Sequence, residues 1–299
     1  MVGRTDPLPT EPRALASGLP LMLVLLFLAA GLSFGREPAR IVSTAPGITE
    51  LLFASGLGAK VVGVSTYCHY PPEVSRIAKV GTYTQPNLEV ILSLKPDLVV
   101  IQKNPIQLKQ KLESLHLEVL ELNYDDIAGI YQSIAQLDRY GGHARELTAS
   151  IRSGLENVRT RTMRLPKRRI VFVVGRNPGS LEGTVVAGRN SYLSEVIAIA
   201  GGINIFDDTV SPYPKVGLED LLARRPDVIV DMGDMSQTTG VTEEQKRNVE
   251  SLWQRHPLFK AMGTARIHAV ASDIYVVPGP RVVEAAKAFA RMLHPGAGI

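Results

Sequence analysis

The chain contains an internal repeat, and this repeat limits the folds open to it more than any other feature. Its two copies read "NLEVILSLKPDLVV" (87–100) and "GLEDLLARRPDVIV" (217–230). They share Leu88/Leu218, Glu89/Glu219, Leu92/Leu222, Pro96/Pro226, Asp97/Asp227 and Val100/Val230. Because proline disfavours a helical residue before it, each copy predicts a helix that ends before the proline. The apolar run after each aspartate predicts a buried strand.

A second, weaker similarity supports the duplication. The stretches "TELLFASGLG" (49–58) and "SEVIAIAGGI" (194–203) match at Glu50/Glu195 and at Gly56/Gly201. The two similarities have different offsets, as expected if the loops of two related lobes differ in length. A chain of 299 residues is long enough for two lobes, each with its own core.

Short runs rich in valine and isoleucine alternate with helical patterns along most of the chain. The expected strands are 40–43, 61–65, 97–101, 117–122, 168–174, 227–231 and 266–272. The expected helices begin near Thr49, Leu88, Ile106, Tyr192, Leu218, Glu243 and Arg281. Several strands are apolar throughout, which is typical of parallel strands covered on both faces. The pattern predicts an α/β fold with two Rossmann-like lobes, each built on a central parallel sheet.

The middle of the chain differs, because 125–164 contains no strand-like run. After the break "GGH" (141–143), apolar residues recur at Leu147, Ile151, Leu155 and Val158 with helical spacing. A helix of about 22 residues would be roughly 33 Å long and could join the two lobes. The predicted organisation is an N-terminal segment (1–35), a first lobe (36–141), a linker helix (142–165) and a second lobe (166–299).

The N-terminal segment has the composition of an export signal. Arg4 and Arg13 precede an uncharged, strongly apolar stretch that ends in small residues. The alternative is an uncleaved anchor, because about 20 apolar residues can just span a bilayer. Either interpretation places the rest of the chain outside the cytoplasm.

Charge and cysteine content exclude other classes. The net charge is +4 and the basic residues are scattered, apart from a short run at 159–169 that fits the polar end of a helix, so no nucleic-acid footprint is present. Cys68 is the only cysteine, which rules out an internal disulfide. It also lies far from the N-terminal segment, which argues against a lipid-modified N-terminus.

Five stretches together resemble one known family. They are "RIVSTAPGITELLFASGLGAKVVGVS" (40–65), "YPPEV" (70–74), "VGTYTQPNLEVILSLKPDLVV" (80–100), "GGINIF" (201–206) and "SDIYVVPGPRVVEAAK" (272–287). In this order the chain, from Arg40 to about Leu293, resembles the substrate-binding proteins of vitamin B12 and iron-siderophore uptake, the helical-backbone metal-receptor class. The second and fifth stretches favour the cobalamin-binding type.

The resemblance implies a class III solute-binding protein with a single backbone helix between its lobes. Such a protein is a monomer that captures a metal chelate between the lobes and delivers it to an ABC permease dimer in the inner membrane. In this family a glutamate on each lobe meets arginines of the permease, and those positions fall on Glu89 and Glu219. The alternative is that both glutamates only favour the positive N-terminal ends of their helices.

A ligand site is expected in the loops at the carboxyl ends of the strands. Five of the nine tyrosines fall in these loops. Tyrosine combines a flat apolar ring with a hydroxyl, which suits a large macrocycle with amide edges. The predicted ligand-binding residues are Pro46, Tyr67, His69, Tyr70, Tyr83, Tyr213, Asp273, Tyr275 and Arg281.

Several features leave the ligand open among a corrinoid, haem and a ferric siderophore. Haem-binding relatives carry an iron-ligating tyrosine at the position of Tyr83, but "TQPNLE" after it lacks the basic residue those proteins tend to have. Cobalamin binders often place tryptophan in these loops, whereas the sole tryptophan, Trp253, lies elsewhere. Cys68 and His69 alone do not make a closed metal site. Arg281 either contacts the ligand, starts the last helix or pairs with Glu284.

No catalytic motif is present. The chain lacks a phosphate loop, a GxSxG elbow and zinc-type histidine spacing. We therefore expect a carrier without a catalytic cofactor. The alternative from another class is a periplasmic enzyme that modifies a metal chelate.

Overall fold

The computed structural model of the chain describes residues 1, 3, 37–103, 107–234, 242–262 and 265–299. The predicted export signal lies almost wholly outside these residues. Residues 37–299 form one compact unit. Within the described ranges, no helix combines the length and the apolar character that crossing a bilayer requires.

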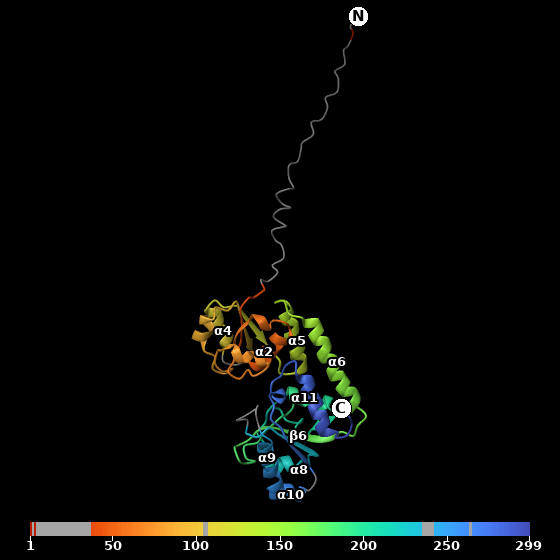
Figure 1. Ribbon diagram of the computed structural model, residues 1–299. Coiled ribbons are helices and arrows are strands. Elements are labelled where there is room, and N and C mark those ends of the chain that lie inside the picture. The colour runs from red at the N-terminus through yellow and green to blue at the C-terminus, as the bar shows by residue number, and fades with distance from the viewer. Residues whose placement is uncertain (2, 4–36, 104–106, 235–241, 263–264) are drawn as a thin grey trace. The chain divides into compact units, whose positions relative to one another are not determined.

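The first half of this unit contains a parallel sheet of five strands (Figure 1). Its order is β3-β2-β1-β4-β5, and every neighbouring pair is parallel. The strands are β1 (Ile41–Ser43), β2 (Val61–Val64), β3 (Ala78–Lys79), β4 (Leu98–Gln102) and β5 (Val119–Leu122). The helices of this half are α2 (Pro46–Ala54), α3 (Leu88–Ser93), α4 (Leu108–Ser114) and α5 (Ile127–Asp138), with short 3-10 turns at Gly58–Lys60 and Pro72–Arg76.

The second half contains a mixed sheet of five strands. Its central strand β6 pairs in parallel with β9 and β8 and antiparallel with β7. The strands are β6 (Arg168–Gly175), β7 (Val185–Val186), β8 (Gly202–Asn204), β9 (Val228–Asp231) and β10 (Arg266–Ala269). The helices are α7 (Tyr192–Ile199), α8 (Leu218–Ala223), α9 (Glu243–Arg255), α10 (Pro257–Met262) and α11 (Val282–Leu293), with a 3-10 turn η3 at Asp273–Tyr275. Every pairing in this sheet except that of the two-residue strand β7 is parallel, so the predicted α/β fold with a parallel sheet at the centre of each half is confirmed.

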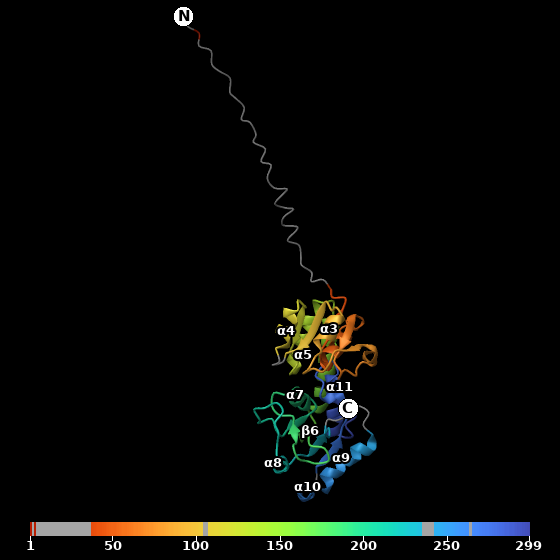
Figure 2. The ribbon, with the colours of Figure 1, turned by 90° about the vertical axis from the view of Figure 1, so that its left-hand side faces the viewer.

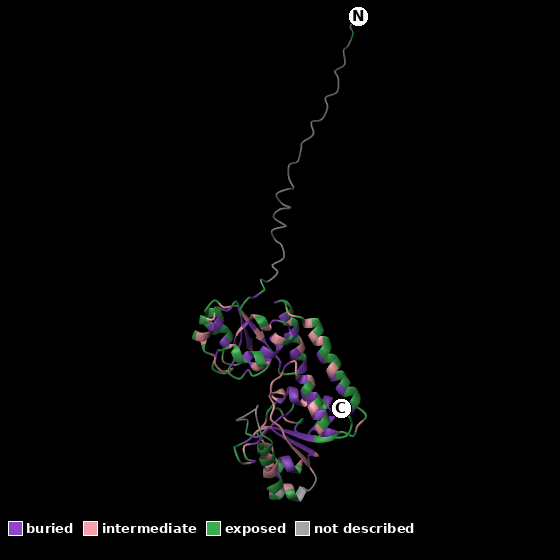
Figure 3. Cartoon of the chain, viewed as in Figure 1, coloured by how far each residue is buried: buried purple, intermediate pink, exposed green. Residues whose placement is uncertain are grey.

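The expected long helix is α6 (Ala144–Thr162). It packs against α5 from the first half and against α7 and α11 from the second (Figure 1). Figure 2 shows α5 in the first half and α7 and α11 in the second from another side. Its apolar face is buried through Ile151, Leu155 and Val158, while its outer face is exposed (Figure 3). The lobe boundaries at 141 and 165 stay predictions, because residues 37–299 form one compact unit.

The proline of each repeat follows a residue in the left-handed region. Lys95 has φ 48° and Arg225 has φ 47°, directly after α3 and α8. The helix therefore ends at the same place in both copies, as Pro96 and Pro226 predict.

The aspartate of each repeat ties two strands together. The Asp97 carboxylate accepts hydrogen bonds from the amides of Ala39 (2.8 Å) and Arg40 (2.9 Å), just before β1. The Asp227 carboxylate accepts one from the amide of Arg169 in β6 (2.8 Å). These aspartates are thus part of the scaffold, and they explain why both copies retain one.

Candidate functional site

Three of the predicted ligand-binding tyrosines expose their rings. The exposed fractions are 59% for Tyr67, 42% for Tyr70 and 43% for Tyr213. Tyr67 and Tyr70 lie in the loop after β2, and Tyr213 lies in the loop before α8. Tyr67 and Tyr70 belong to the first half and Tyr213 to the second, so each half exposes at least one tyrosine from a loop.

Tyr213, although it belongs to the second half, faces residues of the first. Surrounding protein raises the pKa of its hydroxyl to about 12, and the charge of Asp125 contributes further. Asp125 lies just before α5 in the first half. Asp125 in the first half therefore acts electrostatically on Tyr213 in the second.

Tyr83 is half-buried and packs against the core. It lies near Tyr124, whose pKa is raised well above its usual value by burial first and then by nearby groups that include Tyr83 and Asp125. The Tyr124 hydroxyl donates a hydrogen bond to Oε1 of Gln102 (3.0 Å). The charge of Asp125 thus acts on both Tyr124, its neighbour in the chain, and Tyr213. We call Tyr67, Tyr70, Tyr83 and Tyr213 the site tyrosines.

Tyr275 does not join this surface. Only 6% of it is exposed, and its ring contacts Phe172 and Phe289 at centroid distances of 5.7 and 5.4 Å. Its carbonyl accepts a hydrogen bond from the hydroxyl of the buried Tyr192. The sequence places Tyr275 in a cleft loop, but the 3-10 turn η3 directs the ring into the core.

Arg281 is held by two carboxylates. Its Nε is 2.8 Å from Oε2 of Glu50, its Nη2 also contacts Glu50, and its Nη1 is 3.0 Å from Oδ1 of Asp273. Arg281 immediately precedes α11, as one of the sequence interpretations expected, but its partners are Glu50 and Asp273 instead of Glu284. Two of the predicted ligand-binding residues, Asp273 and Arg281, are therefore already bonded to each other.

Glu50 is almost completely buried at 2% exposure. Burial raises the pKa of its carboxyl to about 7, while the hydrogen bonds from Arg281 oppose that rise. Burial by itself would lower the pKa of Arg281, but its hydrogen bonds to Glu50 and Asp273 together raise it, so the guanidinium remains charged.

The remaining predicted residues differ in surroundings. Cys68 is buried, its Sγ lies 3.1 Å from Oγ1 of Thr49, and burial raises the pKa of the thiol. His69 is exposed, and Pro46 occupies the first turn of α2. A buried neutral thiol is a poor metal ligand. Among the residues that the structure describes, no three His, Cys, Asp or Glu side chains group as a metal site.

Glu89 and Glu219 occupy matching places in the first turns of α3 and α8, and both are exposed. Asn87 caps α3 by accepting from the amide of Val90 (3.1 Å). In the described parts of the chain, neither glutamate forms an ion pair or a side-chain hydrogen bond. Both carboxylates are therefore free to meet a partner.

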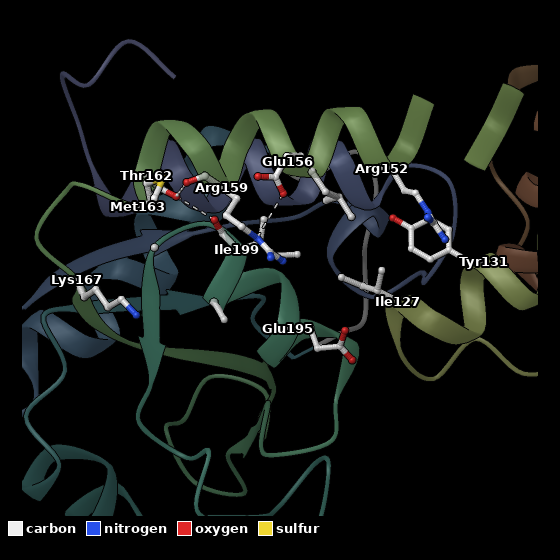
Figure 4. Close-up of a pocket in the computed structure, with 13 residues that line it drawn as sticks. Ile127, Tyr131, Arg152, Glu156, Arg159, Thr162, Met163, Lys167, Glu195 and Ile199 are labelled. Carbon is white, nitrogen blue, oxygen red and sulfur yellow. Dashed lines mark hydrogen bonds and ion pairs between the residues drawn. The ribbon is translucent and has the colours of Figure 1, made fainter. Parts of the chain in front are cut away.

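A separate pocket of about 810 Å³ lies between α5, α6 and α7. Figure 4 shows Arg152 beside the ring of Tyr131 and Arg159 beside Glu156, both pairs near α6. The Arg152 guanidinium lies 4.9 Å from the Tyr131 ring centroid, and Arg159 lies 3.9 Å from Glu156. The pocket contains none of the site tyrosines, and two of its cations already have partners. The ligand site at the tyrosine loops therefore stays a prediction from the sequence.

Sequence reasoning did not assign a role to Glu50, Tyr124 or Tyr192. The match between Glu50 and Glu195 is the sequence signal that could have singled out Glu50. Its ion-pair partner Arg281, however, lies 231 positions away in the sequence. Tyr124 and Tyr192 follow or precede apolar runs and carry no sequence signal of their own.

Comparison with known proteins gives consistent results. The family described as "Periplasmic binding protein" matches residues 41–273. A vitamin B12-binding protein of Photorhabdus laumondii is 27% identical over 91% of this chain and 94% of its own. A vitamin B12-binding protein of Yersinia pestis is 32% identical over 77% of this chain and 80% of its own.

Solved structures with the same fold include two carriers with different ligands in their names. The periplasmic vitamin B12 binding protein BtuF of Vibrio cholerae has a TM-score of 0.70 and 27% identity over 86% of this chain and 97% of its own. The periplasmic heme-binding protein RhuT from Roseiflexus sp. RS-1 has a TM-score of 0.68 and 25% identity over 85% of this chain and 99% of its own.

Proposed function

Because this chain belongs to the periplasmic binding protein family, we propose that it is an extracytoplasmic receptor that captures a corrinoid and passes it to an ABC permease. The observation that carries this proposal is the similarity to vitamin B12-binding proteins over nearly the whole chain, at 27% identity across 91% of it. The exposed rings of Tyr67, Tyr70 and Tyr213 give the similarity a physical basis.

Binding is non-covalent in this proposal. The rings of Tyr67, Tyr70 and Tyr213 offer flat apolar faces to a macrocycle, and their hydroxyls can bond to amide groups at its edge. Because these loops belong to both halves of the chain, the ligand lies between two lobes that α6 keeps at a fixed separation. His69 and Pro46 complete the rim.

Export and delivery follow from the same assignment. The N-terminal segment directs the chain across the inner membrane, either as a cleaved signal or as an anchor. The receptor then docks as a monomer on the permease dimer, with Glu89 and Glu219 facing arginines of the permease. Exposed ion pairs add only about 0–1 kcal/mol each, but a charge on each lobe fixes orientation and speeds encounter.

The decisive experiment is calorimetric titration of the purified protein with cyanocobalamin, cobinamide, haemin and a ferric siderophore. We expect saturable binding of the two corrinoids at a stoichiometry of one. Binding of haemin or the siderophore alone would refute the proposal that the ligand is a corrinoid. It would not affect the conclusion that the chain belongs to the periplasmic binding protein family. The absorption spectrum of the ligand should be the same before binding and after release, since a permanent change would indicate an enzyme.

The aromatic contacts are tested by substitution. We expect Tyr213→Ala to weaken cyanocobalamin binding by about tenfold, since stacking on an aromatic ring contributes roughly 1–1.5 kcal/mol. Tyr131→Ala, in the pocket beside α6, is the matched control and should leave the affinity unchanged.

Haem is the second candidate ligand, and Tyr83 is the observation that favours it. Phenolate is a hard oxygen donor suited to ferric iron. If haem is the ligand, Tyr83→Phe abolishes the charge-transfer absorption of a tyrosine-ligated haem. If a corrinoid is the ligand, the same variant loses only a hydroxyl and retains most of its affinity.

A further inference from the structure

Arg281 has almost no freedom to move. Its side chain is 11% exposed, and the two carboxylates that hold it are 1% (Glu50) and 15% (Asp273) exposed. Nε and Nη2 both contact Glu50, so the contact has two points and fixes the plane of the guanidinium as well as its position.

The same guanidinium supports a site tyrosine. Its central carbon lies 4.2 Å from the centroid of the Tyr70 ring, and the ring is 42% exposed. A cation above an aromatic face attracts the ring, and the attraction depends on the position of the cation over that face. The orientation of Tyr70 therefore depends on the orientation of Arg281.

This arrangement joins the two halves of the chain. Glu50 lies in α2 of the first half, and Arg281 lies 231 positions later, before α11. Around them the backbones are in close contact, because a Cβ on Gly47 would lie 2.3 Å from the carbonyl oxygen of Pro278. The loop that carries Arg281 is thus seated directly on the start of α2.

We propose that Glu50 is a positioning residue for the ligand site, which acts by holding Arg281 over the ring of Tyr70. Through this chain of contacts a residue of the second half fixes an aromatic ring of the first half. Glu50 itself does not touch the ligand. The proposal rests on the proposed function for the identity of the ligand, whereas the coupling from Glu50 to Tyr70 can be measured without any ligand.

Glu195 supplies a matched control. It occupies the position in α7 that matches Glu50 in α2, but it is exposed. Within the described ranges no ion pair involves its carboxylate. A glutamate-to-glutamine substitution can therefore be made at equivalent positions of the two halves. At position 50 the glutamate holds an arginine that lies against a tyrosine ring, and at position 195 it does not.

The first measurement follows Tyr70 directly. The full chain labelled with 3-fluorotyrosine is studied by fluorine NMR, and the Tyr70 resonance is assigned with Tyr70→Phe. We expect Glu50→Gln and Arg281→Lys to shift or broaden this resonance, because both remove the two-point charged contact. Glu195→Gln should leave it in place. An unmoved Tyr70 resonance in a natively folded Glu50→Gln or Arg281→Lys protein overturns the proposal, and if one variant fails to fold the other decides.

The second measurement uses cyanocobalamin as the probe in calorimetry. We expect Glu50→Gln to weaken binding by about tenfold, and to have no further effect when Tyr70→Ala is already present, because the two residues act along one path. Fully additive losses would overturn the proposal. If the wild-type protein binds no corrinoid while the Tyr70 resonance still responds to Glu50→Gln, the proposed ligand is wrong and the positioning role stands.

Discussion

At the scale of single residues, the most consequential charge is the buried Asp231. Its Oδ2 accepts hydrogen bonds from Nε of Arg176 (2.9 Å) and from Nε1 of Trp253 (2.6 Å), and its Oδ1 accepts from the amide of Gly233 (2.6 Å). The Arg176 and Asp231 side chains are 2% and 0% exposed.

Replacing this carboxylate should be costly. We expect Asp231→Asn to lower the free energy of unfolding by about 3–5 kcal/mol, because it leaves the Arg176 guanidinium buried without a counter-charge. Urea denaturation followed by circular dichroism measures the loss. Asp220→Asn is the control, because Asp220 pairs with Arg224 at 3.0 Å on an exposed surface and should cost no more than about 1 kcal/mol. If Asp231→Asn and Asp220→Asn lowered the free energy of unfolding equally, burial of the Asp231–Arg176 pair would not make its carboxylate costlier to remove.

Glu50 predicts a pH dependence of stability. Its pKa is about 7 in the folded protein and near 4.5 when exposed, so between these pH values the folded state holds a proton that the unfolded state has released, and the charged contact with Arg281 belongs to the ionised form above about pH 7. The contribution to stability is fully present below about pH 4.5 and is lost as the pH rises through about 7. Relative to Glu50→Gln, we expect the wild-type unfolding free energy to fall by on the order of 3 kcal/mol across that window. Parallel curves for the two proteins would show that the carboxyl titrates normally.

At the scale of elements, the contact between α6 and α11 depends on a missing side chain. Gly154 lies in the middle of α6, and a Cβ there would lie 2.6 Å from Cγ1 and 3.4 Å from Cβ of Val283 in α11. Val283 is β-branched and close to its own backbone, so it cannot turn away.

We expect Gly154→Ala to destabilise the protein, although alanine favours a helix over glycine by about 1 kcal/mol. The double variant Gly154→Ala/Val283→Ala should be more stable than Gly154→Ala alone, because the second change removes the clash. Thermal unfolding compares the variants. A stabilised Gly154→Ala protein would mean that α6 and α11 can move apart at no cost.

Elements with a periodic pattern could be predicted from the sequence, and elements held only by pairing could not. The strands before Thr44 and after Asp97 and Asp227 lie where the apolar runs predict them, and α6 covers the predicted helical stretch. In contrast, β3 and β7 contain only two residues each, and the three residues of β8 (Gly202–Asn204) include a single apolar side chain, so none of the three forms an apolar run. The loop positions of the tyrosines were predictable, whereas the inward turn of Tyr275 depends on packing against Phe172 and Phe289, which no local pattern encodes.

At the scale of the whole molecule, the proposed docking on a permease separates transport from binding. We expect charge reversal at both Glu89 and Glu219 to abolish receptor-stimulated uptake, because both free carboxylates would then repel the arginines they should meet. Ligand affinity should be unchanged, since both side chains lie on exposed first turns of α3 and α8. Uptake into vesicles and calorimetry measure the two properties. Reversal of Asp220 is the control, and a loss of affinity in the double reversal would place these glutamates in the ligand site.

Trp253 can report whether the two halves of the chain unfold together. The single indole is fully buried in the core of the second half, away from the first sheet. Its fluorescence therefore records the melting of that half alone, whereas far-ultraviolet ellipticity records both. Coincident transitions would show that α6 couples the two halves, so that they unfold as one cooperative unit. Separated transitions would show that one half can stay folded after the other has unfolded.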